Sequence, residues 1–181
     1  MQLTETPIKD CYLFTPKVFR DHRGFFCETF RKERFATLTG IETDFVQDNQ
    51  SESTYGVLRG LHYQKAPHGQ AKLVRVVMGK VLDVVVDLRK DSPSFGKHYS
   101  TVLDESNMNQ LFIPKGCAHG FLTLSERSVF AYKCDAYYSP DADTGIRYDD
   151  ATLGIDWHLP SDELIISEKD KGLPNFDPAN F

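Results

Sequence analysis

The chain has 181 residues, 40% of them hydrophobic, and a formal net charge of −5, which is close to the average of a soluble globular protein. This length suits one domain of ordinary size, and we expect residues 1–181 to form a single domain. The acidic charge argues against binding to nucleic acid polymers or anionic membranes, and no apolar run approaches the ~20 residues of a transmembrane helix. The N-terminus lacks the basic and apolar regions of a signal peptide, so we expect a cytoplasmic protein.

Short extended segments dominate the predicted elements in chain order. Residues 19–30 and 45–50 look extended, and a short helix is expected within 28–38, ended by Gly40. The valine-rich stretch 72–88 indicates two strands joined by a tight turn at Gly79-Lys80. A second strand pair is expected at 99–103 and 109–113, then strands at 121–124 and 128–138, and a short helix at 162–167 capped by Ser161. Many short strands and few helices predict a β-sandwich or barrel, not a doubly wound α/β fold.

Motifs of several common classes are missing. The sequence has no G-x-G-x-x-G, no P-loop and no G-x-S-x-G, which disfavours a dinucleotide-binding fold, an NTPase and a serine hydrolase. Four cysteines stand at 11, 27, 117 and 134, and none forms a C-x-x-C pair. We therefore expect reduced thiols that act as small buried hydrophobes.

Two clusters carry residues suited to chemistry. One contains RGLHYQ at 59–64, followed by HGQAK at 68–72, and the other is IPKGCAHGF at 113–121. Gly116 and Gly120 lie on either side of His119 and allow a close approach of the backbone. The glycine-rich settings favour functional roles for His62 and His119, whereas His22, His98 and His158 are expected to be ordinary surface or core residues.

Two chemistries fit a β-barrel with inward histidines. A metal site could use His62, His68 and His119, but the His-x-His motif is absent and no Glu occurs between positions 52 and 105. Metal-free acid–base chemistry would use a neutral His as base, because its unperturbed pKa of about 6.5 lies near the working pH. Such a base needs a carboxylate partner and a cation to stabilise an enolate oxygen, for which Lys72 is a candidate. Tyr132 could be the acid on the opposite face of the reacting carbon.

The ordered motifs along the chain resemble one enzyme family. The motifs are FRDHRGFF at 19–26, QDNQS at 47–51, VLRGLHYQ at 57–64, QAKLVR at 70–75, PKGCAHGF at 114–121, IDW at 155–157 and SEKD at 167–170. Together they are similar to the dTDP-4-dehydrorhamnose 3,5-epimerases. The resemblance implies an all-β, cupin-type double-stranded β-helix (jelly roll) with a few short flanking helices, a homodimer, and no metal or other cofactor.

The resemblance also implies roles for particular residues. His62 matches the catalytic base, Asp170 its carboxylate partner 108 positions away, Tyr132 the proton donor and Lys72 the residue that stabilises the enolate. The residues that match nucleotide-sugar contacts are Arg23, Glu28, Gln47, Asn49, Arg59, His119 and Lys169, with Tyr138 at the position that stacks on thymine. Asp143 stands where the family often has Glu, which shortens the reach of that side chain by one methylene.

One geometric condition follows from these roles. In a regular strand, Arg59 and His62 would point to opposite faces. If both side chains reach the ligand, Gly60 is expected to mark a β-bulge, or one of the two residues lies beyond the strand end.

The expected reaction inverts C3 and C5 of dTDP-4-dehydro-6-deoxy-D-glucose and gives dTDP-4-dehydro-L-rhamnose, on the route to dTDP-L-rhamnose. Arginines such as Arg23 and Arg59 can bind the diphosphate bidentately, and the C4 ketone acidifies both neighbouring C–H bonds. Four alternatives stay open: an epimerase acting at one carbon only, a ketoisomerase of dTDP-sugars, a metal-dependent cupin enzyme, and a sugar-binding module without catalysis.

Overall fold

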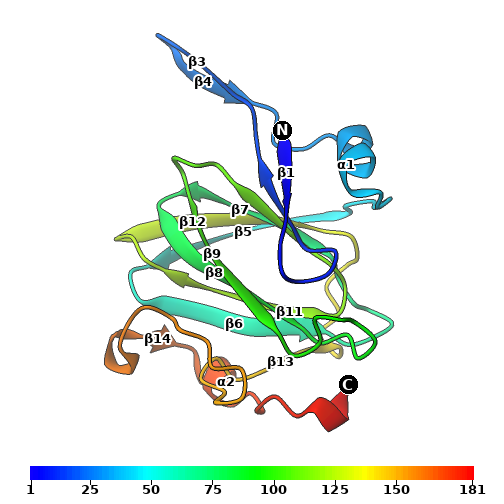
Figure 1. Ribbon diagram of the computed structural model, residues 1–181. Helices are drawn as coiled ribbons and strands as arrows, with labels where there is room; N and C mark the ends of the chain where they lie inside the picture. Colours follow the sequence, from blue (N-terminus) through cyan, green and yellow to red (C-terminus); the bar gives the residue numbers. More distant parts are fainter.

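Two antiparallel sheets face each other in the computed structural model, which describes residues 1–181 (Figure 1). The first sheet has the order β1–β2–β10–β7–β12–β5, with bounds Gln2–Glu5, Tyr12–Thr15, Gln110–Ile113, Lys72–Met78, Arg127–Cys134 and Gln47–Thr54. The second has the order β13–β6–β11–β8–β9, with bounds Asp143–Gly145, Val57–Gln64, Cys117–Thr123, Lys80–Asp87 and His98–Asp104. Paired sheets of this kind form a jelly roll, so the all-β prediction is confirmed.

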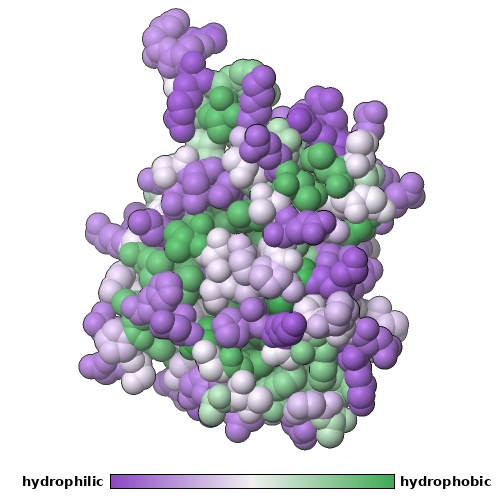
Figure 2. Space-filling view, in the orientation of Figure 1, coloured by the Kyte–Doolittle hydropathy of each residue, from purple (hydrophilic) through white to green (hydrophobic).

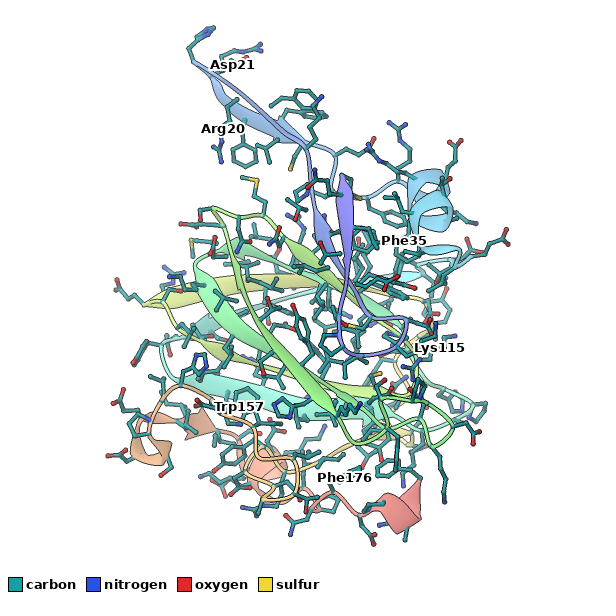
Figure 3. All side chains as sticks on the ribbon, in the orientation of Figure 1. Arg20, Asp21, Phe35, Lys115, Trp157 and Phe176 are labelled. Carbon is teal, nitrogen blue, oxygen red and sulfur yellow. The ribbon has the colours of Figure 1, made fainter.

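The alternation of β8 explains how the second sheet is buried on both faces. Val81 and Val85 belong to the core between the sheets, whereas Leu82, Val84 and Val86 belong to a core on the outer face. Residues 147–181 cover that outer face, with Trp157 and Phe176 packed against it (Figure 3). Both faces of β8 are therefore shielded from water, and any charged side chain on this strand needs a partner inside the protein.

The turn predicted at Gly79 exists, but its two strands do not pair with each other. β7 pairs with β10 and β12, whereas β8 crosses to the other sheet and pairs with β9 and β11. The expected pair β9 and β10 is likewise divided between the two sheets. The prediction of paired neighbours was wrong because the valine pattern specifies strands and buried faces but carries no information about which strands pair.

A hairpin of β3 (Val18–Asp21) and β4 (Gly24–Cys27) projects from the body of the molecule (Figure 1). It carries three exposed phenylalanines, Phe19, Phe25 and Phe26, and Phe26 is 69% exposed. Apolar surface gathers on this arm below a polar tip (Figure 2); Asp21 lies near the tip, and Arg20 lies lower on the arm, where its side chain faces β7 (Figure 3). An apolar arm of this kind is the type of surface that proteins usually cover with a partner.

The helices are short, and one of the two predictions about them was wrong. α1 spans Lys32–Thr39 and ends at Gly40, whose φ of 71° is the left-handed conformation that glycine favours, as expected. The helix predicted at 162–167 is instead a 3₁₀ turn, η1 (Ser161–Glu163), followed by strand β14 (Ile165–Ile166), which pairs in parallel with β6. The helical turn comes later, as α2 (Glu168–Lys171), because the Ser167 hydroxyl accepts a hydrogen bond from the Asp170 N–H and caps it. A final 3₁₀ turn, η2, spans Pro178–Asn180, and no helix is long and apolar enough to cross a membrane.

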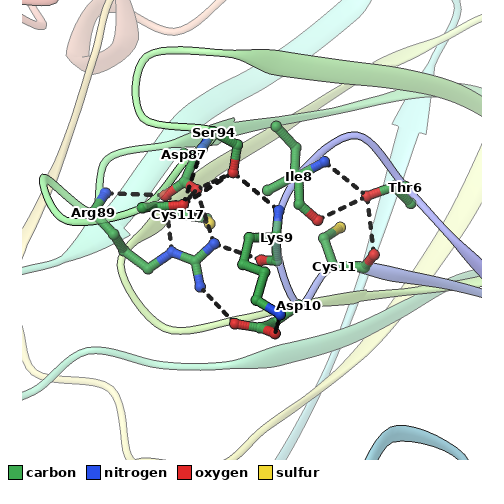
Figure 4. A network of polar contacts seen from close by, with 10 residues as sticks. Thr6, Ile8, Lys9, Asp10, Cys11, Asp87, Arg89, Ser94 and Cys117 are labelled. Carbon is green, nitrogen blue, oxygen red and sulfur yellow. Dashed lines mark hydrogen bonds and ion pairs between the residues drawn. The ribbon is translucent and has the colours of Figure 1, made fainter.

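A polar network ties the N-terminal segment to the loop after β8 (Figure 4). The buried Asp87 carboxylate accepts hydrogen bonds from Arg89 Nε at 2.8 Å and from the hydroxyls of Ser92 and Ser94, and Ser94 Oγ accepts from the Lys9 N–H at 2.9 Å. Burial alone raises the pKa of Asp87, but these hydrogen bonds outweigh it and lower the pKa to about 2. The negative charge of Asp87 is therefore compensated by the hydrogen-bond donors of this network.

Three of the four cysteines are small buried hydrophobes as expected, whereas Cys27 at the end of the hairpin is only half-buried. All four are free thiols, and Cys11, Cys117 and Cys134 are buried. Burial raises the pKa of the Cys11 thiol to about 12, which keeps it protonated and unreactive.

Candidate active site

A cleft opens between the two sheets, where β6 and β11 face β7 and β12 and where β14 and α2 close one side. Its first lobe has a volume of about 550 Å³ and is lined by Arg59, His62, Lys72, His119, Tyr132, Lys169 and Asp170, among others. A second lobe of about 340 Å³ is lined by Gln47, Asn49, Tyr138 and Asp143 and shares His62, Lys72 and Tyr132 with the first. The two lobes therefore form one continuous cleft that meets at these three side chains.

His62 on β6 and Asp170 on α2 form a dyad at this meeting point. His62 Nε2 lies 2.7 Å from Asp170 Oδ1, and the Gly60 N–H donates to Asp170 Oδ2 at 3.1 Å. Burial alone raises the pKa of Asp170, but the hydrogen bond and charge of His62, the Gly60 N–H and the Ser167 side chain outweigh it and leave the pKa below its usual value. Because a carboxylate only accepts, the ring donates from Nε2, and the neutral ring keeps its lone pair at Nδ1.

The β-bulge expected at Gly60 is present. Between the pairs His119↔His62 and Phe121↔Arg59, β6 contains one residue more than β11, so both Arg59 and His62 line the cleft. Gly60 has a φ of +125°, and a Cβ at this position would lie 2.6 Å from the Gly120 Cα. The two facing glycines are thus what allows the strands to approach here.

Lys72 and Tyr132 stand on the opposite wall of the cleft, on the first sheet. Lys72 Nζ lies 5.8 Å from the centre of the Tyr132 ring, and both side chains are half-buried. Burial lowers the pKa of Lys72, and burial, joined by the neighbouring Cys134 and Asp143, raises the pKa of Tyr132. A phenol with a raised pKa stays protonated and remains available as a proton donor.

A second dyad lies beside the first one. His119 pairs directly with His62 across β11 and β6, and His119 Nε2 lies 2.9 Å from Asp83 Oδ2. The carboxylate of Asp83 is fully buried. Asp83 was not among the predicted site residues, although an Asp between the valines of the run VLDVVVD at 81–87 is itself a signal of a buried charge.

The second lobe is held together by hydrogen bonds. Asp143 Oδ2 accepts from Tyr138 Oη at 3.1 Å and from Lys169 Nζ at 2.5 Å. The Tyr138 N–H donates to Gln47 Oε1 at 2.9 Å, and Gln47 Nε2 donates to Asn49 Oδ1 at 3.0 Å. The aspartate at position 143, although shorter than glutamate, therefore reaches both Tyr138 and Lys169.

Arg23 and Glu28 are the two predicted site residues that lie outside the cleft of their own chain. Arg23 lies in the turn of the projecting hairpin, and its guanidinium pairs with Asp21 at 2.6 Å. Glu28 follows the hairpin and pairs with Arg31. Neither residue lines either lobe of the cleft.

The three histidines of the metal-site alternative are not brought together. His62 and His119 each lie against a carboxylate at Nε2, and His68 is exposed in the loop after β6. No group of three or more His, Cys, Asp or Glu side chains is arranged to hold a metal ion.

The cleft is suited to moving protons to and from carbon. An imidazole with a carboxylate partner lies on one wall, a phenol lies on the other, and an ammonium group lies beside the phenol. A base and an acid on opposite sides of a bound molecule can remove a proton from one face of a carbon and return one to the other. Fold and site together define a jelly-roll protein whose cleft holds the groups that acid–base chemistry at carbon requires.

Comparison with known proteins identifies the family. The sequence profile of dTDP-4-dehydrorhamnose 3,5-epimerase matches residues 5–178. The chain is 46% identical to the epimerase of that name from Shigella flexneri over 181 residues, which covers 100% of this chain and 99% of the relative. The chain belongs to the dTDP-4-dehydrorhamnose 3,5-epimerase family, whose members are isomerases.

Solved structures give the same result. The crystal structure of the epimerase from Elizabethkingia anophelis superposes with a TM-score of 0.96 at 49% identity, covering 100% of this chain and 99% of that one. The Legionella pneumophila enzyme, solved in complex with dTDP-4-keto-L-rhamnose, superposes with a TM-score of 0.90 at 43% identity, covering 97% and 98%. A 3′-monoepimerase from Streptomyces bikiniensis is more distant, with a TM-score of 0.87, 34% identity and coverage of 94% and 85%. The predicted cupin-type jelly roll is thus confirmed.

Proposed function

We propose that the protein inverts C3 and C5 of dTDP-4-dehydro-6-deoxy-D-glucose and forms dTDP-4-dehydro-L-rhamnose for dTDP-L-rhamnose biosynthesis. The observation that carries this proposal is the pairing of His62 and Asp170 at 2.7 Å on the wall of the cleft opposite Tyr132. Membership of the epimerase family supports the choice of substrate, as does the dTDP-sugar bound in the related Legionella structure.

The reaction is a pair of proton transfers through an enolate. The C4 ketone acidifies the C–H bonds at C3 and C5, and Nδ1 of His62 removes the proton from one of them. The electron pair moves onto the C4 oxygen, where the Lys72 ammonium stabilises the negative charge. Tyr132 returns a proton to the opposite face and is reprotonated from solvent, while the imidazolium stays paired with Asp170 until it loses its proton. The same steps at the second carbon complete the double inversion.

The remaining residues of the cleft bind the nucleotide sugar in this proposal. Arg59 and Lys169 carry positive charge toward the diphosphate, and His119 contacts the sugar beside His62. Tyr138 is 54% exposed at the mouth of the second lobe, which leaves its ring free to stack on thymine. Gln47, Asn49 and Asp143 surround it with polar groups that suit the base and the deoxyribose.

We further propose a cytoplasmic homodimer in which the projecting hairpin of one copy reaches the cleft of the other. The exposed phenylalanines of the arm support this, because a second copy would cover them and bring Arg23 and Glu28 to a cleft that they do not line in their own chain. Four free cysteines suit a reducing compartment. A dimer in sedimentation experiments, and an Arg23→Ala variant with a KM raised about tenfold at nearly unchanged kcat, would support the exchange. A monomer that retains full activity would refute it.

The test of the reaction is incubation with dTDP-4-dehydro-6-deoxy-D-glucose in D₂O, followed by NMR. Deuterium is expected at both C3 and C5 together with the L-rhamno product. Uptake at one carbon only would identify a monoepimerase like the Streptomyces relative, and a 3-keto product would identify a ketoisomerase. No uptake at either carbon would reject epimerisation.

A pair of histidine variants separates catalysis from binding. His62→Asn is expected to lower turnover by roughly 10²-fold or more with dTDP binding largely kept, since a general base contributes on that scale. His68→Asn is the matched control, because His68 is exposed in a loop outside the cleft. If His62→Asn kept its turnover, His62 would not be the base. If His68→Asn lost its turnover and a metal chelator abolished the turnover of the wild type, the results would support a metal-dependent cupin enzyme instead.

A further inference from the structure

Asp83 is a carboxylate in a position built for an aliphatic side chain. On β8 it alternates with Val81 and Val85, which pack in the core between the two sheets, and it is 0% exposed. A carboxylate enclosed in such a core is strongly disfavoured unless other groups compensate its charge. Its presence therefore requires partners on the inner face of the barrel.

Only one of its two oxygens has a partner. Asp83 Oδ2 lies 2.9 Å from His119 Nε2, whereas Asp83 Oδ1 is the one buried side-chain nitrogen or oxygen within residues 1–181 that makes no hydrogen bond. Native proteins rarely leave such an atom unsatisfied, and the exceptions cluster at functional sites.

Lys72 is the matching group on the opposite sheet. Its ammonium makes no hydrogen bond or ion pair and has only the face of the Tyr132 ring at 5.8 Å. The charged groups, imidazoles and thiol that surround it come from five strands and from α2, with the Tyr132 phenol beside them. They are Cys134, Asp143, Arg59, His62, His119, Asp83, Lys169 and Asp170. Lys72 therefore needs a source of negative charge among them to remain protonated while half-buried.

The other acidic neighbours do not supply that charge. Burial raises the pKa of the Cys134 thiol, so it stays neutral at physiological pH. Asp143 is already shared by Lys169 and Tyr138, and the two oxygens of Asp170 are taken by His62 Nε2 and the Gly60 N–H. This leaves the fully buried Asp83 as the carboxylate with a free oxygen.

We propose that Asp83 is the counter-ion of Lys72 and the anchor of His119, a positioning residue that holds both side chains at the floor of the cleft. Oδ2 fixes the ring of His119 through Nε2, and the negative charge at Oδ1 favours the ammonium form of Lys72 without a direct ion pair to it. This proposal rests on the proposed role of Lys72 as the group that stabilises the enolate. Asp83 itself does not line the cleft and does not touch the reacting carbons.

The sign of the expected effect follows from the charges. Lysine is charged below its pKa, and a neighbouring carboxylate favours the charged form. Removal of the Asp83 charge therefore lowers the pKa of Lys72 further, beyond the lowering that burial already causes. The ammonium is then lost at a lower pH, and with it the stabilisation of the enolate.

The experiment compares Asp83→Asn with wild type across pH 6–10. We expect kcat to fall roughly 10- to 100-fold, KM to stay within about threefold, and the alkaline limb of the kcat profile to move to lower pH by about one unit. Asp87→Asn is the matched control, because Asp87 is a second fully buried aspartate on the same face of β8 whose partners lie in the network of Figure 4. It is expected to lower stability without moving the alkaline limb.

Unchanged kcat and an unchanged alkaline limb in Asp83→Asn would overturn the proposal. So would a loss that is confined to KM, because the carboxylate would then act by binding substrate directly. A shift of the limb in Asp87→Asn equal to that in Asp83→Asn would reduce both effects to general destabilisation and would also overturn it.

A second measurement does not depend on the variant folding or on turnover. In wild-type protein labelled with ¹³C,¹⁵N-lysine, the Lys72 resonance is assigned by its loss in Lys72→Met and titrated without ligand. We expect Lys72 to remain a charged ammonium at pH 8, and a neutral amine at that pH would overturn the proposal. A charged Lys72 in a protein without epimerase activity would leave the charge interaction standing and reject the proposed reaction instead.

Discussion

The dyad of His62 and Asp170 yields the sharpest prediction, through the substitution Asp170→Asn. The side chain of Asp170 is only 4% exposed, so water cannot replace the lost charge. The substitution keeps the shape and one acceptor for the Gly60 N–H, but it removes the negative charge 2.7 Å from His62 Nε2. The imidazolium formed during proton abstraction then has no counter-ion.

The magnitude follows from the strength of that contact. A hydrogen bond to a charged group contributes about 1.5–3 kcal/mol, and about 1.4 kcal/mol corresponds to a factor of ten in rate. Full burial favours the upper end, so kcat is expected to fall by roughly 10²-fold. An amide that donates to Nε2 would also force the ring proton onto Nδ1, and the loss would then approach ~10⁴-fold.

The assay is steady-state formation of the L-rhamno product, followed by NMR in parallel with deuterium uptake at C3 and C5. Glu168→Gln is the control on the same short helix, because its side chain is 89% exposed and pairs only with Lys171. The control is expected to keep full activity, and KM in Asp170→Asn is expected to change less than about fivefold. A kcat within threefold of wild type in Asp170→Asn would refute the reasoning.

Three further predictions concern the strands, the acid and the N-terminal network. Gly60→Ala is expected to destabilise the protein by about 2–4 kcal/mol in urea unfolding, because the new Cβ would lie 2.6 Å from the backbone of Gly120. Gly24→Ala is the control, because Gly24 also has a positive φ but no atom within 4 Å of the added Cβ. An equal loss of stability in Gly24→Ala would rule out the clash as the cause. Tyr132→Phe is expected to lower product formation at least ~100-fold while deuterium exchange by His62 persists, and a loss of both would contradict the division of roles. The pKa of Asp87 is lowered to about 2, so the Asp87 carboxylate contributes about 2 kcal/mol of stability at neutral pH. This contribution is lost as the pH falls from about 4 to 2, and the urea midpoint of Asp87→Asn is expected to lack that part of the pH dependence.

The sequence predicted strands well and their partners poorly. The valines of residues 72–88 identify β7 and β8, and Gly79 marks the turn, whose φ of +82° and close approach to the Arg127 carbonyl need glycine. The same valines are buried on both faces in β8, so no polar side of the strand indicates its neighbours. Pairing was decided by contacts between distant parts of the chain, which a local pattern does not contain.

In the candidate site, too, local patterns predicted individual residues but not their partners. His62 and His119 stand out by their glycine-rich surroundings, and the bulge at Gly60 follows from requiring both Arg59 and His62 to face the ligand. The partnership with Asp170, 108 positions away, could be anticipated only from the resemblance, because no local signal links the two segments. Asp83 was visible as a charge among valines, but its orientation toward His119 depends on the register of β8 against β11.

The catalytic site is complete only when the C-terminal segment is docked on the second sheet. Residues 147–181 cover the outer face of the second sheet and carry Asp170, which contacts the Gly60 N–H at the bulge and His62. A chain with both sheets formed but this segment undocked would therefore have His62 without its carboxylate partner. Trp157, the sole tryptophan, is buried against that sheet within the same segment. During refolding, its fluorescence would therefore report the docking step, and enzymatic activity should return together with that signal rather than with the earlier formation of β-structure.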